Sequence, residues 1–291
     1  MLPKKIYLSA ALMLFFLIGS CSAFQGPAAS FQQEPDYAPL KKQIEEFIAQ
    51  RPGKAYGIYF QDLGSGKSFG INENNPMTAA STVKMPLSLY LSTLVAEKKI
   101  SWDTRLIYQQ FTDYEGGNGI LRYSAREGDR YSVRSLNTLS LTISDNIAFR
   151  MLARSLGREN FVSFMKGLGG KTVYPGGRNL TTARDMGLYV QGILDLARRR
   201  PVEGNRLLDD LSHSVYHVGL PGLLPENVMV AHKEGDLDEG VADDAGVVFC
   251  SRPYILVVLS SGVKDLDEGF RDIARISKLA FDYQEKLHSS K

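Results

Sequence analysis

The chain has 291 residues, of which 44% are hydrophobic and 23% are charged, and its formal net charge is +2. These values fit one globular domain, or two closely fused subdomains, with a substantial hydrophobic core. A charge so near balance argues against the basic surface typical of nucleic-acid-binding proteins, so we expect no nucleic-acid partner.

Residues 1–21 have the pattern of an export signal rather than of a folded element. Lys4 and Lys5 precede an apolar run, residues 6–18, that is shorter than the roughly 20 residues needed to span a bilayer. Gly19 and Ser20 then stand before Cys21, as at the processing site of a bacterial lipoprotein. We interpret Cys21 as the lipidated N-terminus of the mature protein; the alternative is an ordinary signal peptide with an incidental cysteine.

Residues 22–37 are rich in alanine, glutamine, proline and serine, a composition typical of a flexible tether. The tether would join the lipid to a folded domain that covers residues 38–291. We therefore expect an exported protein, anchored through its lipid to the membrane of the bacterial cell envelope, on the periplasmic or extracellular face.

The folded domain is predicted to have an α/β (α+β) fold. Apolar spacing predicts a first helix over residues 39–51, and alternation predicts a hairpin of strands 55–63 and 67–71. Further helices are predicted at 102–111, 133–141, 186–199 and 267–287. Further strands are predicted at 228–231, 246–250 and 254–261. Together they indicate a five-stranded antiparallel sheet flanked by helices, plus an all-helical subdomain.

Residues 79–99 are predicted to form a helix that carries Ser81 three residues before Lys84. Positions i and i+3 share one face of a helix, so the Ser81 hydroxyl and the Lys84 amine would lie within reach of each other. A base beside a serine can take its proton as the oxygen attacks, and the helix N-terminus adds positive potential. Ser81 is thus the candidate nucleophile and Lys84 its base.

The Ser-x-x-Lys pattern is weak by itself, because it occurs by chance about once or more in a chain of this length. It recurs at Ser163, inside a predicted helix, and at Ser261, where a predicted strand ends. Only Ser81 is followed by two further motifs, which are Ser144-Asp145-Asn146 and Lys233-Glu234-Gly235.

Motifs of the type SxxK, SDN and K-[ST]-G, in this order, mark the serine penicillin-binding proteins and class A β-lactamases. From about residue 40 to the C-terminus, the chain resembles that family. The resemblance implies a serine hydrolase that forms an acyl-enzyme with β-lactams, and we expect a monomer without cofactor or metal. One alternative is a DD-carboxypeptidase or penicillin-binding protein acting on D-Ala-D-Ala-type stem peptides of peptidoglycan. The other is a catalytically degenerate lipoprotein that only binds in the envelope.

The resemblance also implies roles for the SDN motif. Ser144 would relay a proton to the leaving nitrogen, and Asn146 would help to hold the lysine and the substrate. Asp145 is more typical of a structural residue that caps a helix and holds backbone.

The third motif would complete the site from a strand. Lys233 would act in catalysis as a second cation that, with burial, lowers the pKa of Lys84 from the value of about 10.4 of a free lysine. Glu234, Gly235 and Asp236 would contact the substrate. The backbone N–H of Asp236, with that of Ser81, would hold the oxyanion.

Two departures from the family pattern affect the expected activity. The loop 167–179 contains no carboxylate, whereas class A β-lactamases carry there the glutamate that activates the hydrolytic water. Glu159 and Asp185 flank the loop, and we interpret both as partners of helix dipoles. Glu234 replaces the Thr or Ser whose hydroxyl helps to bind the substrate carboxylate. We therefore expect slow deacylation, and repulsion between Glu234 and a substrate carboxylate.

Overall fold

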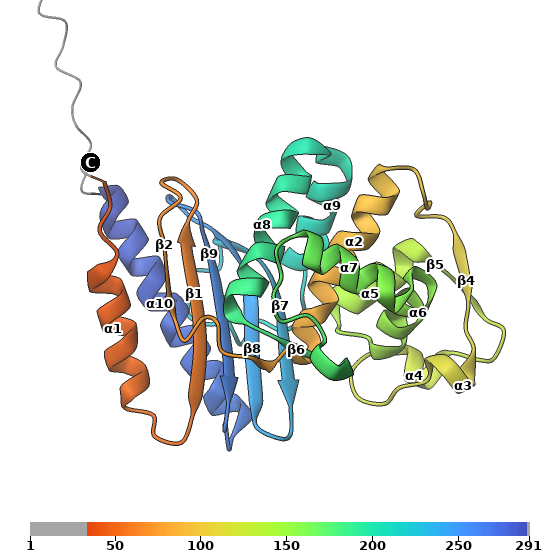
Figure 1. The fold of residues 1–291 in the computed structure, drawn as a ribbon, viewed down its shortest axis with the longest axis horizontal. Coiled ribbons are helices and arrows are strands. Elements are labelled where there is room, and N and C mark those ends of the chain that lie inside the picture. The colour runs from red at the N-terminus through yellow and green to blue at the C-terminus, as the bar shows by residue number, and fades with distance from the viewer. Residues whose placement is uncertain (1–33, 290–291) are drawn as a thin grey trace, which may run out of the picture. The chain divides into compact units, whose positions relative to one another are not determined.

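The computed structural model describes residues 34–289 of the chain (Figure 1). The predicted signal peptide, most of the tether and the predicted lipidation site at Cys21 lie outside this range. Within the described residues, no helix has both the length and the hydropathy that crossing a membrane requires.

A five-stranded antiparallel sheet organises the domain, in the order β2-β1-β9-β8-β7. Its strands are β1 (Ala55–Asp62), β2 (Ser68–Ile71), β7 (Met229–Leu237), β8 (Val241–Phe249) and β9 (Tyr254–Ser261). All residues of the central strand β9 except Ser261 are buried, so both faces of the sheet are covered. The predicted fold is therefore confirmed, and the strand predicted at 228–231 extends far enough to include Lys233 and Glu234.

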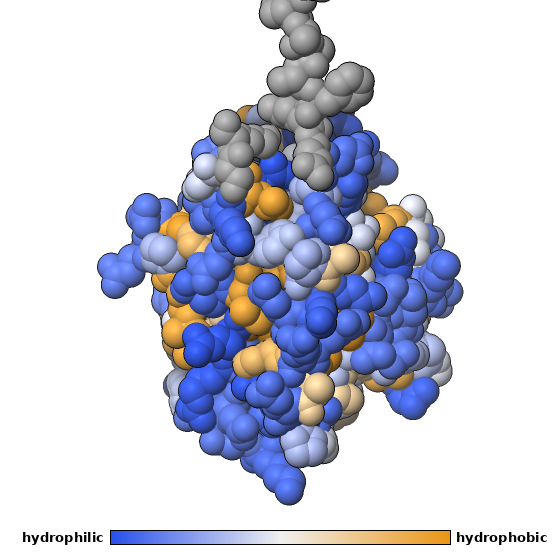
Figure 2. Space-filling model, turned by 90° about the vertical axis from the view of Figure 1, so that its left-hand side faces the viewer, coloured by the Kyte–Doolittle hydropathy of each residue, from blue (hydrophilic) through white to orange (hydrophobic). Residues whose placement is uncertain are grey.

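Two terminal helices, α1 (Ala38–Ala49) and α10 (Leu266–Ser289), pack together on one face of the sheet (Figure 1). Their apolar residues Leu40, Ile44, Ile273 and Ile276 share one core cluster with Phe60 of β1. This side of the domain faces the viewer in Figure 2 and is largely hydrophilic, with scattered apolar spots. That pattern is expected of amphipathic helices that bury one stripe against a sheet.

The opposite face of the sheet is covered by α8 (Ala183–Arg199), which also contacts α2 (Lys84–Ala96) and α9 (Pro201–Ser212). Helix α2 is buried almost all round, with Met85, Leu87, Leu89 and Leu91 in the core, as expected of a helix apolar on every side. The other helices of this helical subdomain are α3 (Gln110–Asp113), α4 (Leu121–Ser124), α5 (Val133–Thr142), α6 (Asn146–Leu156) and α7 (Arg158–Gly167).

One predicted helix is wrong. Residues 102–111 form instead the short strand β4 (Arg105–Ile107), paired with β5 (Arg130–Ser132), and the start of α3. Leu106 and Tyr108 point inward while Arg105 is exposed, and this alternation is the period of a strand rather than of a helix.

The segment that carries Ser81 lies at the junction of the sheet and the helical subdomain. The 3₁₀ helix η1 (Ala80–Val83) joins β3 (Met77–Thr78) to α2 and contacts β7 and β8. The predicted continuous helix over 79–99 is thus corrected, because the α-helix begins only at Lys84. Ala80 has a φ of +42°, which a residue with a Cβ rarely adopts and which a regular helix cannot contain.

The loop after α7 closes onto the same junction. It contains the 3₁₀ helix η2 (Pro175–Gly177) and ends in β6 (Leu180–Thr181), which pairs with β3. The loop is therefore held directly behind the turn that carries Ser81.

Candidate active site

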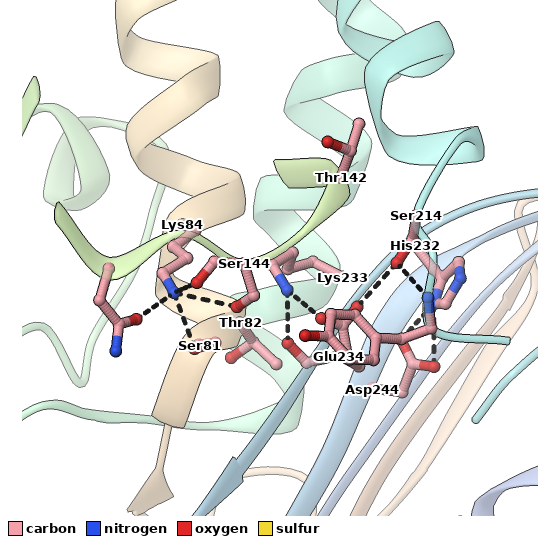
Figure 3. Close-up of polar contacts among 12 residues, drawn as sticks. Ser81, Thr82, Lys84, Thr142, Ser144, Ser214, His232, Lys233, Glu234 and Asp244 are labelled. Atoms are coloured by element: carbon pink, nitrogen blue, oxygen red, sulfur yellow. Dashed lines mark hydrogen bonds and ion pairs between the residues drawn. The ribbon is translucent and has the colours of Figure 1, made fainter. Parts of the chain in front are cut away.

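The Lys84 amine is the centre of a compact polar network (Figure 3). Its Nζ lies 3.0 Å from Oγ of Ser81, 2.9 Å from Oγ of Ser144, 2.7 Å from the Ser144 backbone oxygen and 2.7 Å from Oδ1 of Asn146. An ammonium has only three hydrogens for these four oxygens. A neutral amine can donate to the two carbonyl oxygens and accept a hydrogen from a hydroxyl, which is the arrangement that a general base requires.

Burial and the nearby charge of Lys233 lower the pKa of Lys84 to about 7. The side chain is only 2% exposed, so its charged form loses most of its hydration. The pKa therefore moves in the predicted direction and from the predicted causes. At neutral pH a large fraction of Lys84 is the free amine, within hydrogen-bond distance of the Ser81 hydroxyl.

The motif Ser144-Asp145-Asn146 is held by its middle residue. The Asp145 carboxylate caps α6 by accepting from the N–H of Ala148, at 2.9 Å, and also accepts from the N–H groups of Ile120 and Leu121. The predicted structural role of Asp145 agrees with these bonds. They fix Ser144, which has a φ of +55°, with its hydroxyl directed to Lys84.

The glycine-rich segment 115–121 forms a wall of the site against this motif. Nδ2 of Asn146 donates to the Gly116 oxygen at 2.7 Å, and the Asn146 N–H donates to the Asn118 oxygen at 3.1 Å. A Cβ at Gly119 would lie 2.3 Å from the Asp145 carboxyl carbon, and Gly119 has a φ of +108°. Glycine at this position thus allows the wall to close against α6.

Strand β7 approaches the Ser81 turn closely because it carries Gly235. A Cβ at this position would lie 2.7 Å from the Ser81 nitrogen and 3.0 Å from the Thr82 nitrogen. The absence of a side chain lets the β7 backbone lie against η1, so the following residue, Asp236, borders the site beside Ser81. This is the approach that an oxyanion hole shared by two backbone N–H groups needs.

Lys233 and Glu234 form a buried ion pair with each other. The Lys233 amine donates to the Glu234 carboxylate and, at 3.1 Å, to the Glu234 backbone oxygen. The carboxylate also accepts from the Ser214 hydroxyl at 3.2 Å (Figure 3). Burial opposes ionisation of Glu234, but the adjacent Lys233 charge holds the pKa of this carboxyl below its usual value.

The geometry changes the interpretation of Glu234. The sequence suggested a carboxylate that faces the substrate, but Glu234 is 3% exposed and does not line the cavity. Its carboxylate is turned toward Lys233 because burial removes water from both charges, and pairing with the opposite charge offsets part of that desolvation penalty. Glu234 therefore cancels the charge of Lys233 and does not face a ligand; Lys233 is itself fully buried and does not line the cavity either.

Ser81, Lys84 and Asn146 line a cavity of about 920 Å³. Its walls come from the 115–118 segment, from α6 and α7, from the loop around Tyr174 and Asn179, and from the turn after β7. In the described part of the chain, no group of three or more His, Cys, Asp or Glu side chains is arranged to hold a metal.

The loop 167–179 contributes Tyr174, Gly177 and Asn179 to the cavity, and no carboxylate. Glu159 is exposed on α7 and does not line the cavity. The Asp185 carboxylate accepts from the N–H groups of Lys171 and Thr172, at 3.1 and 2.7 Å, so it folds the loop rather than facing Ser81.

Asn179 has a role that the sequence did not indicate. Its Nδ2 donates to the Ala80 oxygen at 3.0 Å, and its backbone oxygen accepts from the Ala79 N–H at 3.0 Å. These bonds hold the strained residue that precedes Ser81. No local pattern marks such an asparagine, since its partners lie about 100 residues earlier in the chain.

Comparison with known proteins agrees with this geometry. A family model described as "Beta-lactamase enzyme family" matches residues 39–284. Among solved structures, the chain is similar to PBP-A, with 27% identity, a TM-score of 0.80, and coverage of 87% of this chain and 98% of that one. A point mutant of PBP-A, solved as an acyl-enzyme complex with penicillin G, has 27% identity and a TM-score of 0.78, over 85% and 97% of the two chains.

A β-lactamase from Sphaerobacter thermophilus shares the fold, with 22% identity, a TM-score of 0.76, and coverage of 87% of this chain and 99% of that one. No curated protein sequence matches the chain significantly.

Proposed function

We infer that this chain, which belongs to the beta-lactamase enzyme family, is a serine enzyme that β-lactams acylate at Ser81 and that releases the acyl group slowly. The observation that carries the proposal is the 3.0 Å contact between Ser81 and a buried Lys84 whose pKa is lowered to about 7. The complete network around Lys84 speaks against a degenerate site that only binds.

Acylation would begin when Oγ of Ser81 attacks the amide carbon of the ligand and its proton passes to the neutral Lys84 amine. The backbone N–H groups of Ser81 and Asp236 would stabilise the negative oxygen of the tetrahedral intermediate. When the C–N bond breaks, the proton would pass from Lys84 through the Ser144 hydroxyl, 2.9 Å away, to the leaving nitrogen. Lys84 would then be neutral again.

Deacylation needs a second nucleophile, a water molecule, and a base to activate it. The loop 167–179 has no carboxylate, so it places none in the cavity to serve as that base. A general base contributes about 10²–10⁴-fold, so we expect β-lactam turnover slower by about that factor than in an enzyme with such a glutamate.

A DD-peptidase acting on D-Ala-D-Ala-type stem peptides is the second candidate. The loop without a carboxylate favours this candidate. The similarity to PBP-A also favours it, since a mutant of PBP-A was solved as an acyl-enzyme complex with penicillin G. A peptide acyl-enzyme could pass to a neutral amine, which is a stronger nucleophile than water; as the amide forms and the ester bond to Ser81 breaks, the proton of the amine would return to Ser81 through Lys84.

The test is labelling with a fluorescent penicillin, followed by a chase with unlabelled penicillin and by assay of a diacetyl-Lys-D-Ala-D-Ala peptide. A stable label at Ser81 with slow release is expected, and release of D-alanine would select the peptidase. Rapid nitrocefin hydrolysis would contradict slow deacylation, and an absence of any label would contradict the proposal.

We also propose that Cys21 anchors the protein to the cell envelope, on the pattern of the leader alone. Expressed with its leader, the wild-type chain should partition with the membrane fraction, and Cys21→Ser should be released from it. A wild-type chain that partitions as soluble would overturn this proposal.

A further inference from the structure

Three carboxylates border the cavity where β7 ends, namely those of Asp236, Asp238 and Glu239, which we call the acidic rim. Asp238 and Glu239 are exposed and Asp236 is half-buried. None of the three takes part in an ion pair among the described residues. The rim therefore gives this end of the cavity a negative potential.

The cations of the site are engaged elsewhere. Lys233 is paired with Glu234, Arg150 lies 3.2 Å from the Glu115 carboxylate, and Arg154 lies 2.7 Å from the buried carboxylate of Asp113. Their charges are cancelled locally and do little to offset the rim.

The remaining guanidinium, that of Arg158, belongs to another wall of the cavity. It donates to the Gly177 oxygen at 2.7 Å and lies over the Tyr174 ring, both on the loop after α7. The charge along β7 is thus set by the rim.

The direction of β7 tells which part of a ligand would meet the rim. The strand runs from Lys233, past Gly235 beside Ser81, to the rim. Penicillins and D-Ala-D-Ala peptides carry a carboxylate on the leaving-group side, and the rim repels it. A ligand carbonyl held between the N–H groups of Ser81 and Asp236 would therefore have its leaving group away from the rim, toward Lys233. Its acyl substituent therefore points toward the rim.

Strand β7 is also the last strand of the sheet, so one side of its backbone has no strand partner in the described fold. An extended acyl substituent can lie along such an edge and pair with its backbone groups. This brings the substituent past the carboxylates of Asp236, Asp238 and Glu239.

We propose that the acidic rim selects substrates with a cationic group, such as a protonated amine, on the acyl side of the reacting amide, over substrates with a carboxylate there. The inference rests on the proposed acylation of Ser81. It adds the substrate class: an acyl donor whose side chain bears an amine, as a peptide with a free amino group does.

Ampicillin and carbenicillin test the proposal, because they carry an amine and a carboxylate on the same side-chain carbon, where benzylpenicillin carries neither. Acylation rates would be measured by competition with a fluorescent penicillin at a pH of about 6.5, below the usual pKa of an α-amino group. We expect the order ampicillin, benzylpenicillin, carbenicillin, with about tenfold or more between first and last. The ratio should fall at high salt.

The matched variants are Asp238→Asn with Glu239→Gln, and Asp103→Asn with Glu226→Gln as control. Both pairs remove the same charges, but Asp103 and Glu226 are exposed and do not line the cavity. The ampicillin-to-carbenicillin ratio should fall severalfold in the rim variant only.

Equal rates for the two penicillins, or a ratio that both double variants change alike, would overturn the acidic rim as the selector while leaving the proposed function intact. Failure of all three penicillins to label Ser81 would reject the proposed function, and this inference with it.

Discussion

Lys84 and Lys233 are both buried lysines of one site, but their partners differ. Lys84, on the helical side, is surrounded by neutral oxygens of Ser81, Ser144 and Asn146. Lys233, on the sheet side, meets the carboxylate of its neighbour Glu234. A neutral surrounding favours the free amine and suits a base, whereas a carboxylate keeps its partner charged but cancels its field. Both lysines are buried, so the difference between their surroundings comes from the nearest partner of each.

Replacing Ser81 by alanine tests whether the helical side alone supplies the nucleophile, and has the largest expected effect. Ser81→Ala should abolish the covalent β-lactam adduct, because the other hydroxyl beside Lys84, that of Ser144, is buried and does not line the cavity. Intact-mass spectrometry checks this. Ser163→Ala, in the second Ser-x-x-Lys pattern, is the matched control and should retain the adduct; an adduct that survives Ser81→Ala would contradict the assignment.

Replacing Lys84 tests whether its neutral amine is the form that takes the Ser81 proton. Lys84→Arg keeps the positive charge but cannot lose a proton, so acylation should fall by about 10²–10⁴-fold. In the wild type, the acylation rate should rise with pH and level off above about 7, since only the deprotonated amine can take the Ser81 proton. Stopped-flow acylation across pH measures both. Lys166→Arg is the control, and a flat wild-type profile would exclude Lys84 as the titrating base.

Replacing Gly235 tests how closely strand β7, on the sheet side, must approach η1, on the helical side. Gly235→Ala places a Cβ 2.7 Å from the Ser81 nitrogen, so β7 and η1 must separate. We expect a loss of about 1–3 kcal/mol in the free energy of unfolding, together with slower acylation. Urea unfolding and acylation rates check it. At Gly167 a Cβ meets nothing within 4 Å, so Gly167→Ala is a matched control. A Gly235→Ala variant as stable and active as the control would mean that the strand can shift freely.

Replacing Glu234 tests the sheet side of the site and has the smallest expected effect on acylation. Glu234→Thr removes the carboxylate that neutralises Lys233, so a penicillin with its ring carboxylate should bind and acylate faster. The attraction between the ring carboxylate and the unpaired Lys233 charge would be worth about 1 kcal/mol in water-like surroundings, or about fivefold, and the gain should shrink at high salt. Benzylpenicillin acylation at two salt concentrations checks it. Ser214→Ala removes only the hydroxyl that contacts Glu234 and should change little. A slower Glu234→Thr variant would show that the ion pair supports the site.

The helical side could be predicted from the sequence because its residues are close in the chain or belong to compact motifs. Ser81 and Lys84 lie within one turn, and Asp145 is a good cap directly before a helix. The fold followed from periodicity, with two exceptions. At 102–111 a strand of three residues is too short to give a clear pattern, and at Ala80 a positive φ, which periodicity does not reveal, delays the start of the α-helix to Lys84.

The sheet side could not be predicted in the same way. Neighbours on a strand start on opposite faces, so nothing in the sequence indicates that the Lys233 side chain bends back to the Glu234 carboxylate. The Asn179 contacts to Ala79 and Ala80 depend on the path of a whole loop, which the sequence does not specify.

The anchoring of that loop has a consequence for how this protein could evolve. Asn179 joins the loop to the Ser81 turn, and Asp185 holds its other part through the N–H groups of Lys171 and Thr172. Between these attachments, residues 175–178 lie outside the core, unlike Val173, so a change of length or composition there would leave both attachments in place. Under the function proposed above, a short insertion that brings one glutamate there would be an accessible evolutionary route from slow to rapid release of the acyl group.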